Sequence, residues 1–146
     1  MNKIESYVFN NNDITELKIP SSITEIGYSA FGNNSISRIN FGDNSELNKI
    51  DSSAFYNNDI TELEIPSSVT EIGSYAFQNN QISELYFPKT VTSLGRDAFS
   101  GNTFESLTIE QCNTPIYKRE NFAGQVKSLI IESGEISSND FKHYIL

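Results

Sequence analysis

The chain has 146 residues, of which 37% are hydrophobic and 12% aromatic, and its formal net charge at pH 7 is -9. This apolar content excludes an intrinsically disordered chain, and the length suits one domain with a continuous core. The acidic balance repels phosphates and anionic lipid headgroups, which argues against nucleic acid and membrane surfaces as partners.

The N-terminal segment carries no targeting signal that can be recognised. Residues 1–9 lack a basic start followed by an apolar stretch, so no signal peptide is predicted. Nowhere does the chain contain about 18 consecutive apolar residues, so no membrane insertion is expected. Either the protein is intracellular, or its sequence begins after a removed leader.

A phenylalanine returns along the chain at a nearly constant step. The six residues are Phe9, Phe31, Phe55, Phe77, Phe99 and Phe122, and the steps between them are 22, 24, 22, 22 and 23 residues. An alanine precedes the phenylalanine in four copies, and an isoleucine or leucine lies five residues before it in the first five. Such a period predicts a solenoid, in which each repeat forms one coil and stacks on the next.

Each copy also contains two apolar residues separated by one position. These pairs are Leu17/Ile19, Ile39/Phe41, Leu63/Ile65, Leu85/Phe87, Leu107/Ile109 and Leu129/Ile131. Because side chains alternate across a strand, both members of a pair face the same side of a short strand. Stacked copies bring these strands about 4.8 Å apart, which predicts a parallel sheet roughly 25 to 30 Å long.

The rest of each copy is predicted to return through a turn or a single helical turn. In residues 72–77, Gly73 permits a tight bend, and Ala76 with Phe77 fills the interior from the outer side. Three residues after each phenylalanine comes a column of amides: Asn12, Asn34, Asn58, Asn80, Asn102 and Gln125. We expect these amides to accept left-handed backbone and to pair with turn backbone groups or with one another. The alternative, a calcium site, would lack the carboxylates that calcium prefers.

Both ends of the array depart from the repeat. The first copy has Val8 where the next four copies have alanine, and no comparable cap is predicted there. We expect its N-terminal edge to be covered by a missing segment, a partner or another copy of the chain. At the other end, Phe141 and the last residues, 144–146, predict an apolar tail over the last coil. The expected division is therefore six repeats of about 22 residues in residues 1–131, followed by a capping segment in residues 132–146.

Outward residues of the predicted sheet are the candidates for ligand binding. Acidic residues and one tyrosine gather near its middle, and the candidates are Glu16, Arg38, Glu62, Glu64, Glu84 and Tyr86. An acidic patch with an aromatic anchor would suit a basic protein segment or a sugar. The alternative interpretation is an ordinary solvated face, whose polar residues only keep the sheet soluble.

The sequence predicts no catalytic, metal or cofactor site. Cys112 is the only cysteine and His143 the only histidine, which is too few for a zinc site of ordinary ligand count. A nucleophilic pair of these two would need contact across a coil and a half. Glu62 and Glu84 would lie about 5 Å apart, as glycosidase carboxylates do, but on an open sheet. We therefore expect a protein that is not an enzyme.

Residues 60–77 read ITELEIPSSVTEIGSYAF and show the repeat in its clearest form. With these residues, the chain resembles BspA-like, or treponemal-type, leucine-rich-repeat proteins over roughly residues 4–131. The resemblance implies a right-handed coil with a parallel sheet on its concave face and turns or short helical segments on its convex face. The chain departs from the family pattern by its asparagine column, where the family has cysteine, and by a step of mostly 22 residues instead of 23.

The same resemblance implies a non-catalytic module for protein binding or adhesion, secreted or at a cell surface. Its concave face would bind a protein or glycan ligand. The alternative is a structural or assembly subunit of a larger surface or virion complex, or an intracellular protein. Such a subunit would contact a neighbouring domain or subunit through its uncapped N-terminal edge.

Overall fold

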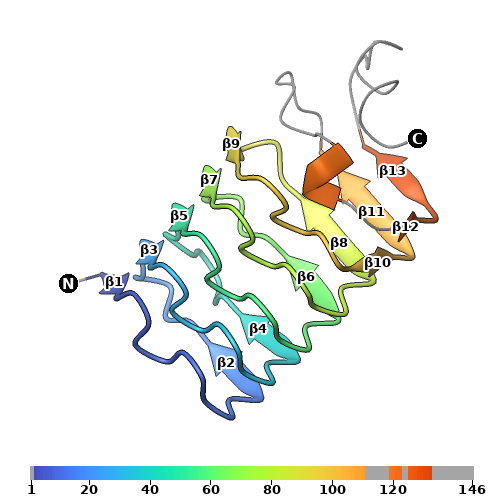
Figure 1. Ribbon diagram of the computed structural model, residues 1–146. Coiled ribbons are helices and arrows are strands. Elements are labelled where there is room, and N and C mark those ends of the chain that lie inside the picture. Colours follow the sequence, from blue (N-terminus) through green and yellow to red (C-terminus); the bar gives the residue numbers. More distant parts are fainter. Residues whose placement is uncertain (1, 111–118, 123–124, 133–146) are drawn as a thin grey trace.

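Short strands recur twice in most coils of the chain and stack into parallel ladders (Figure 1). The computed structural model describes residues 2–110, 119–122 and 125–132. The coils follow one another from β1 at the N-terminal end to β13 at the other end of the described chain (Figure 1). The predicted solenoid of parallel strands is confirmed.

The first set of ladders contains the predicted apolar pairs. Its strands are β2 (Glu16–Lys18), β4 (Arg38–Asn40), β6 (Glu62–Glu64), β8 (Glu84–Phe87), β11 (Ser106–Ile109) and β13 (Leu129–Ile131). The register places Leu63 beside Leu85, and continues through Leu107 to Leu129. In the described chain no ladder joins β4 to β6, so β2–β4 and β6–β8–β11–β13 are separate sheets. This interruption follows the coil of 24 residues, which has two extra residues in the loop after β4.

A second ladder lies in the segment that the sequence predicts as turns. It has five two-residue strands: β1 (Lys3–Ile4), β3 (Glu25–Ile26), β5 (Lys49–Ile50), β7 (Glu71–Ile72) and β9 (Ser93–Leu94). Two further short strands, β10 (Thr103–Phe104) and β12 (Gln125–Val126), pair with each other. The helix of the described chain is a single 3-10 turn, η1 (Arg119–Phe122). Turns follow the strands of the second ladder, as predicted, but the ladder itself was not predicted.

The phenylalanine column forms the spine of the core. Phe31, Phe55, Phe77 and Phe99 are buried, and the ring centroids of successive members lie 5.2 to 5.5 Å apart. Their planes differ by 11° or less, so the rings are stacked. The stacked rings also pack against aliphatic side chains from both ladders. Together these contacts bury apolar area along the solenoid. The in-register stacking predicted from the phenylalanine spacing is therefore present.

The asparagine column ties the backbone of one coil to that of the next. The Asn58 amide donates to the carbonyl oxygens of Phe31 and Phe55, at 2.9 and 3.2 Å. Its side-chain oxygen accepts the backbone N–H of Ile36 at 3.0 Å. Equivalent bonds are made by Asn34, Asn80 and Asn102. The predicted pairing with backbone groups is thus confirmed, whereas among the described side chains of the column no amide bonds another.

Left-handed backbone occurs beside the asparagine column and not in it. The residue before each asparagine has a positive φ, at Asn11, Asn33, Asn57, Asn79 and Gly101. A second left-handed position lies two residues before each phenylalanine, at Tyr7, Ser29, Ser53, Tyr75 and Asp97. The sequence-based placement of the left-handed residues was therefore one position late, and it missed the second position because tyrosine rarely adopts this conformation.

Gly73 and Gly95 directly precede turns, and they also allow a close approach between coils that was not predicted. Neither has a positive φ. A Cβ atom at Gly73 would lie 2.4 Å from the backbone nitrogen of Ser52, and one at Gly95 would lie 2.1 Å from that of Ser74. Only a residue without a side chain lets these coils pack at the observed distance.

Candidate functional site

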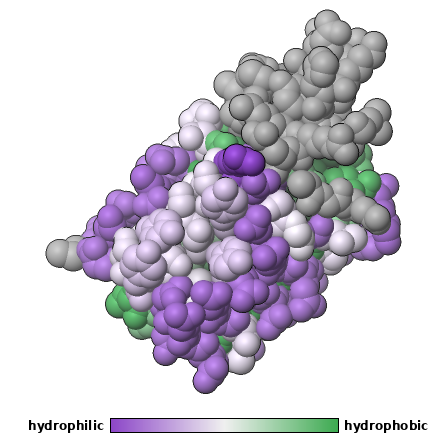
Figure 2. All heavy atoms as spheres, in the orientation of Figure 1, coloured by the Kyte–Doolittle hydropathy of each residue, from purple (hydrophilic) through white to green (hydrophobic). Residues whose placement is uncertain are grey.

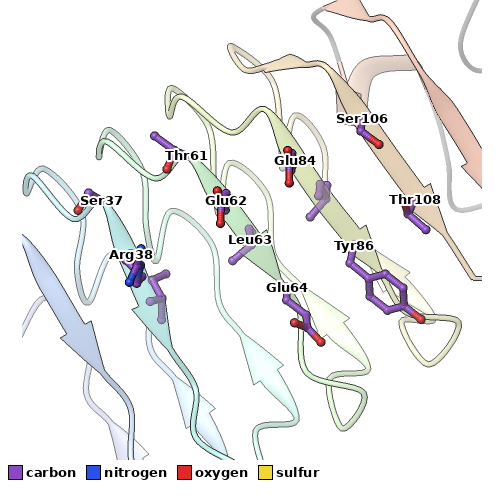
Figure 3. A pocket seen from close by; sticks show the side chains of 12 residues that line it. Ser37, Arg38, Thr61, Glu62, Leu63, Glu64, Glu84, Tyr86, Ser106 and Thr108 are labelled. Atoms are coloured by element: carbon purple, nitrogen blue, oxygen red, sulfur yellow. The ribbon is translucent and has the colours of Figure 1, made fainter.

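A shallow depression lies on the outward side of β4, β6, β8 and β11, which we call the sheet face (Figure 3). Its volume is about 400 Å³. The strands hold its outward residues in fixed rows, because alternate residues of each strand point into the core. The lining residues are Ser37, Arg38, Ile39, Thr61, Glu62, Leu63, Glu64, Glu84, Leu85, Tyr86, Ser106 and Thr108.

Five of the six predicted binding candidates line this depression. They are Arg38, Glu62, Glu64, Glu84 and Tyr86, whereas Glu16 is exposed on β2 and does not line it. The parallel register makes Glu62 a direct neighbour of Glu84, and Glu64 a direct neighbour of Tyr86. The structure thus brings together residues that are 22 positions apart in the sequence.

The depression has an excess of negative charge. Glu62, Glu64 and Glu84 are exposed, and within the described chain none of them forms an ion pair. Arg38 supplies a positive charge at the β4 side, and it also has no carboxylate within 4.0 Å in that part of the chain. Like charges on neighbouring strands repel one another, so a cationic group bound between Glu62 and Glu84 would relieve this repulsion.

Tyr86 is a half-buried side chain held at one side of the depression. Its hydroxyl donates to Glu132 over 3.4 Å. Burial, followed by the negative charges of Glu110 and Glu132, raises the pKa of Tyr86 above its ordinary value. The Glu110 carboxylate accepts a hydrogen bond from the backbone N–H of Lys89 at 3.1 Å. Tyr86 therefore presents a neutral ring beside Glu64, with its hydroxyl directed towards Glu132.

Hydroxyl groups complete the lining and were not among the predicted candidates. Ser106 lies beside Glu84, and Thr108 lies beside Tyr86 in the same register. Ser37 and Thr61 are exposed at the opposite side. The outward positions of Ser106 and Thr108 follow from the strand alternation, whereas Ser37 and Thr61 lie just before β4 and β6. Serine and threonine are so common on solvated sheets that composition does not mark them. The depression thus combines carboxylates, hydroxyls and one aromatic ring.

Other expected features can be placed only in part. Among the described residues, no group of three or more His, Cys, Asp or Glu side chains is arranged to hold a metal ion. No helix in that part of the chain has the length and apolar character needed to cross a membrane. Cys112, His143 and nearly all of the predicted cap, residues 133–146, lie outside the described residues. The division at residue 132 therefore stays a prediction.

Comparison with known proteins identifies the repeat. The family model of the BspA type leucine rich repeat region matches residues 2–129, in six copies. No curated protein and no solved structure matches the chain. The match spans most of the 146 residues, and it includes every strand from β1 to β12.

Proposed function

We propose, because this chain belongs to the BspA-type leucine-rich-repeat family, that it is a non-catalytic protein-binding module. Proteins of this repeat family are commonly used for protein binding or adhesion. The observation that supports a site on this chain is the depression, which gathers Glu62, Glu64, Glu84 and Tyr86 on one face. Solenoids bind ligands on surfaces that equivalent residues of successive coils build together.

The chemistry of the depression favours an extended protein segment with lysine or arginine side chains. A cationic side chain would be attracted by Glu62 and Glu84, and a second could lie over the ring of Tyr86. The hydroxyls of Ser106 and Thr108 offer hydrogen bonds to the backbone of such a segment. Because exposed charges are screened by salt, we expect this binding to weaken as ionic strength rises.

We further propose that the module acts at a cell surface or in a secreted protein. The support is the family, whose members are often surface-associated. Antibody labelling of intact cells, compared with permeabilised cells, would test this location. Labelling that appears only after permeabilisation would contradict it.

Selection of short random peptides on the immobilised chain tests the proposed ligand. We expect the selected peptides to be enriched in lysine and arginine. Tyr86→Ala, and the double variant Glu62→Lys with Glu84→Lys, should each weaken their binding at least about tenfold, which is about 1.4 kcal/mol. Peptides without basic enrichment, or peptides that bind these variants unchanged, would contradict the proposal.

A matched control separates the sheet face from net charge. Asp43 and Glu46 are exposed acidic residues in the loop after β4, and neither lines the depression. The variant Asp43→Lys with Glu46→Lys changes the net charge as much as the double variant of the sheet face. It should keep most of the peptide affinity, and an equal loss would show that only overall charge matters. The chain could instead bind a glycan and no peptide, with Tyr86→Ala abolishing the glycan binding. That result would show that the ligand is a sugar and not a protein.

A further inference from the structure

The ladder that carries the sheet face is open at one boundary, between β4 and β6, which we call the seam. At the boundaries on either side, the backbone N–H groups of Ile19 and Ile65 each donate to a carbonyl of the next coil, at 2.8 and 3.4 Å. The equivalent bond from Phe41 to the carbonyl of Glu64 is absent from the described chain. The seam therefore lacks a bond that fixes the distance between the other strands of the sheet face.

The same two coils are in full contact on their other side. There β5 pairs with both β3 and β7, so the second ladder is continuous. The rings of Phe31 and Phe55 are stacked, and the backbone N–H of Phe31 donates to the carbonyl of Ala54 at 2.9 Å. Because only the sheet side is open, the seam can close by a rotation of one coil against the next about the intact side.

Two extra residues after β4 account for the open seam. The loop of residues 42–46 has five residues, whereas the equivalent loop of the next coil, residues 66–68, has three. At the start of the longer loop Gly42 has left-handed backbone, and its N–H donates to the side-chain oxygen of Asn40 at 2.8 Å. The chain therefore turns away at the end of β4, and Phe41 does not extend the strand.

The open seam separates two opposite charges that both line the depression. Arg38 on β4 and Glu62 on β6 hold equivalent positions, directly before the first apolar residue of each pair, and Figure 3 shows them on the two sides of the seam. They form no ion pair in the described chain. In a closed ladder they would be direct neighbours on strands about 4.8 Å apart, where opposite charges attract.

The second ladder shows how a cation behaves in such a closed arrangement. Lys49 of β5 lies in register between a glutamate of the earlier coil and one of the later coil, and it pairs with the later one, Glu71, at 3.2 Å. Arg38 already has a glutamate of the earlier coil, Glu16, beside it in register. Closure would place Glu62 on its other side. By the same geometry, a closed seam would pair Arg38 with Glu62.

We propose that the two extra residues hold the seam open and thereby keep Arg38 from neutralising Glu62. Glu62 then stays free to bind a cationic side chain of the ligand, whereas a closed seam occupies it with an arginine of the chain itself. The length of the loop after β4 therefore sets the affinity of the sheet face for basic segments. This inference rests on the function proposed above, and it adds an internal cation that competes with the ligand.

Hydrogen exchange tests the open seam without any ligand. In the wild type the amide of Phe41 should exchange at least about tenfold faster than the bonded amide of Ile65. Deleting Asn44 and Ser45 gives the loop the length found in the next coil, and it should slow the Phe41 exchange at least about tenfold. The control that keeps the loop length, Asn44→Gly with Ser45→Ala, should leave the exchange unchanged.

Two results of this measurement would overturn the proposal. One is equal exchange of Phe41 and Ile65 in the wild type, and the other is a deletion variant in which Phe41 exchanges as fast as before. The comparison within the wild type needs no variant, so it stands if the deletion variant does not fold.

The arginine gives a second measurement without ligand. The Nε–H resonance of Arg38 should shift on Glu62→Gln in the deletion variant, where the two side chains are expected to pair. In the wild-type background the same substitution should shift it much less. Shifts of equal size in the two backgrounds would overturn the proposed pairing.

Peptide binding tests whether the pairing matters for the ligand, and the basic peptides selected on the wild type are the probe. The deletion should weaken their binding about threefold, the size expected of an exposed ion pair. When both chains also carry Arg38→Gln, the deletion should no longer weaken it. A deletion variant that binds as tightly as the wild type, or a loss that persists with Arg38→Gln, would overturn this inference alone. A wild type that binds no basic peptide would contradict the proposed function and this inference with it.

Discussion

The side-chain amide nitrogen of Asn58 lies 2.9 Å from the carbonyl oxygen of Phe31, a residue of the preceding coil. Through this bond a buried polar side chain connects two turns whose phenylalanine rings also stack. The same amide bonds within its own coil, to the carbonyl of Phe55. Stability of the solenoid therefore depends on buried hydrogen bonds as well as on apolar packing.

Replacing Asn58 by alanine should destabilise the protein strongly. The change leaves the buried Ile36 N–H without its partner, which costs about 1–3 kcal/mol. It also removes one of the two amide donors from each of the Phe31 and Phe55 carbonyls, which Asn34 and Asn80 still bond. We expect a loss of at least about 2 kcal/mol in the free energy of unfolding, measured by urea denaturation. Asn12→Ala removes one bond at an exposed position and should cost less than about 0.5 kcal/mol. Similar losses for both variants would contradict this role.

The loss of stability on replacing a phenylalanine of the column by alanine should depend on its position. Phe55→Ala creates a cavity between two stacked rings, and such changes cost about 3–5 kcal/mol. Phe9→Ala should cost clearly less, because Phe9 is partly exposed and stacks on only one ring of the column. The two free energies of unfolding can be compared by denaturant titration. A larger loss for Phe9→Ala would show that the first coil is covered in solution.

Adding one methyl group at Gly95 should disturb the stacking of coils. Its Cβ would lie 2.1 Å from the Ser74 backbone nitrogen, so backbone must move. Overpacking of this kind costs about 1–3 kcal/mol, and thermal unfolding should show a lower midpoint for Gly95→Ala. Ser93→Ala, at an exposed residue of the neighbouring strand β9, is the control and should leave the midpoint nearly unchanged. An unchanged midpoint for Gly95→Ala would argue against the observed spacing of these coils.

The phenol of Tyr86 should titrate above the ordinary tyrosine value. Burial and the carboxylates of Glu110 and Glu132 favour its neutral form, which raises its pKa. A raised native pKa means that its contribution to stability is present below the unfolded value of about 10 and is lost as pH rises through the native value. Subtracting the ultraviolet titration curve of Tyr86→Phe from that of the wild type isolates this phenol. The midpoint should fall in Glu132→Gln, and a midpoint that does not respond to this change would contradict the contact.

The sequence alone was sufficient to predict the strands that carry the apolar pairs, since pairs such as Leu63/Ile65 alternate and repeat. It was not sufficient for the second ladder, because strands such as Glu71–Ile72 are too short to show alternation. The backbone position of Tyr75 was also hidden, because a left-handed tyrosine is imposed by its neighbours and not by its own preference.

The candidate site was predictable to a similar extent. Strand alternation identified Glu62, Glu64 and Glu84 as outward residues, and the register of β6 with β8 brings them together. The contact of Tyr86 with Glu132 was not predictable, since Glu132 belongs to a segment that the repeat pattern does not cover. Glu16 does not line the depression because it lies on β2, one strand beyond β4, which supplies the outermost lining residues.

The sheet face requires successive coils to lie in register, and contacts between phenylalanine rings measure this most directly. In a protein labelled only at phenylalanine, nuclear Overhauser effects should connect Phe31 to Phe55, Phe55 to Phe77 and Phe77 to Phe99, whose centroids lie 5.2 to 5.5 Å apart. Rings two coils apart, such as Phe31 and Phe77, should show no direct effect. Absence of the effects between neighbours, or effects between rings of distant coils, would contradict the stacked solenoid.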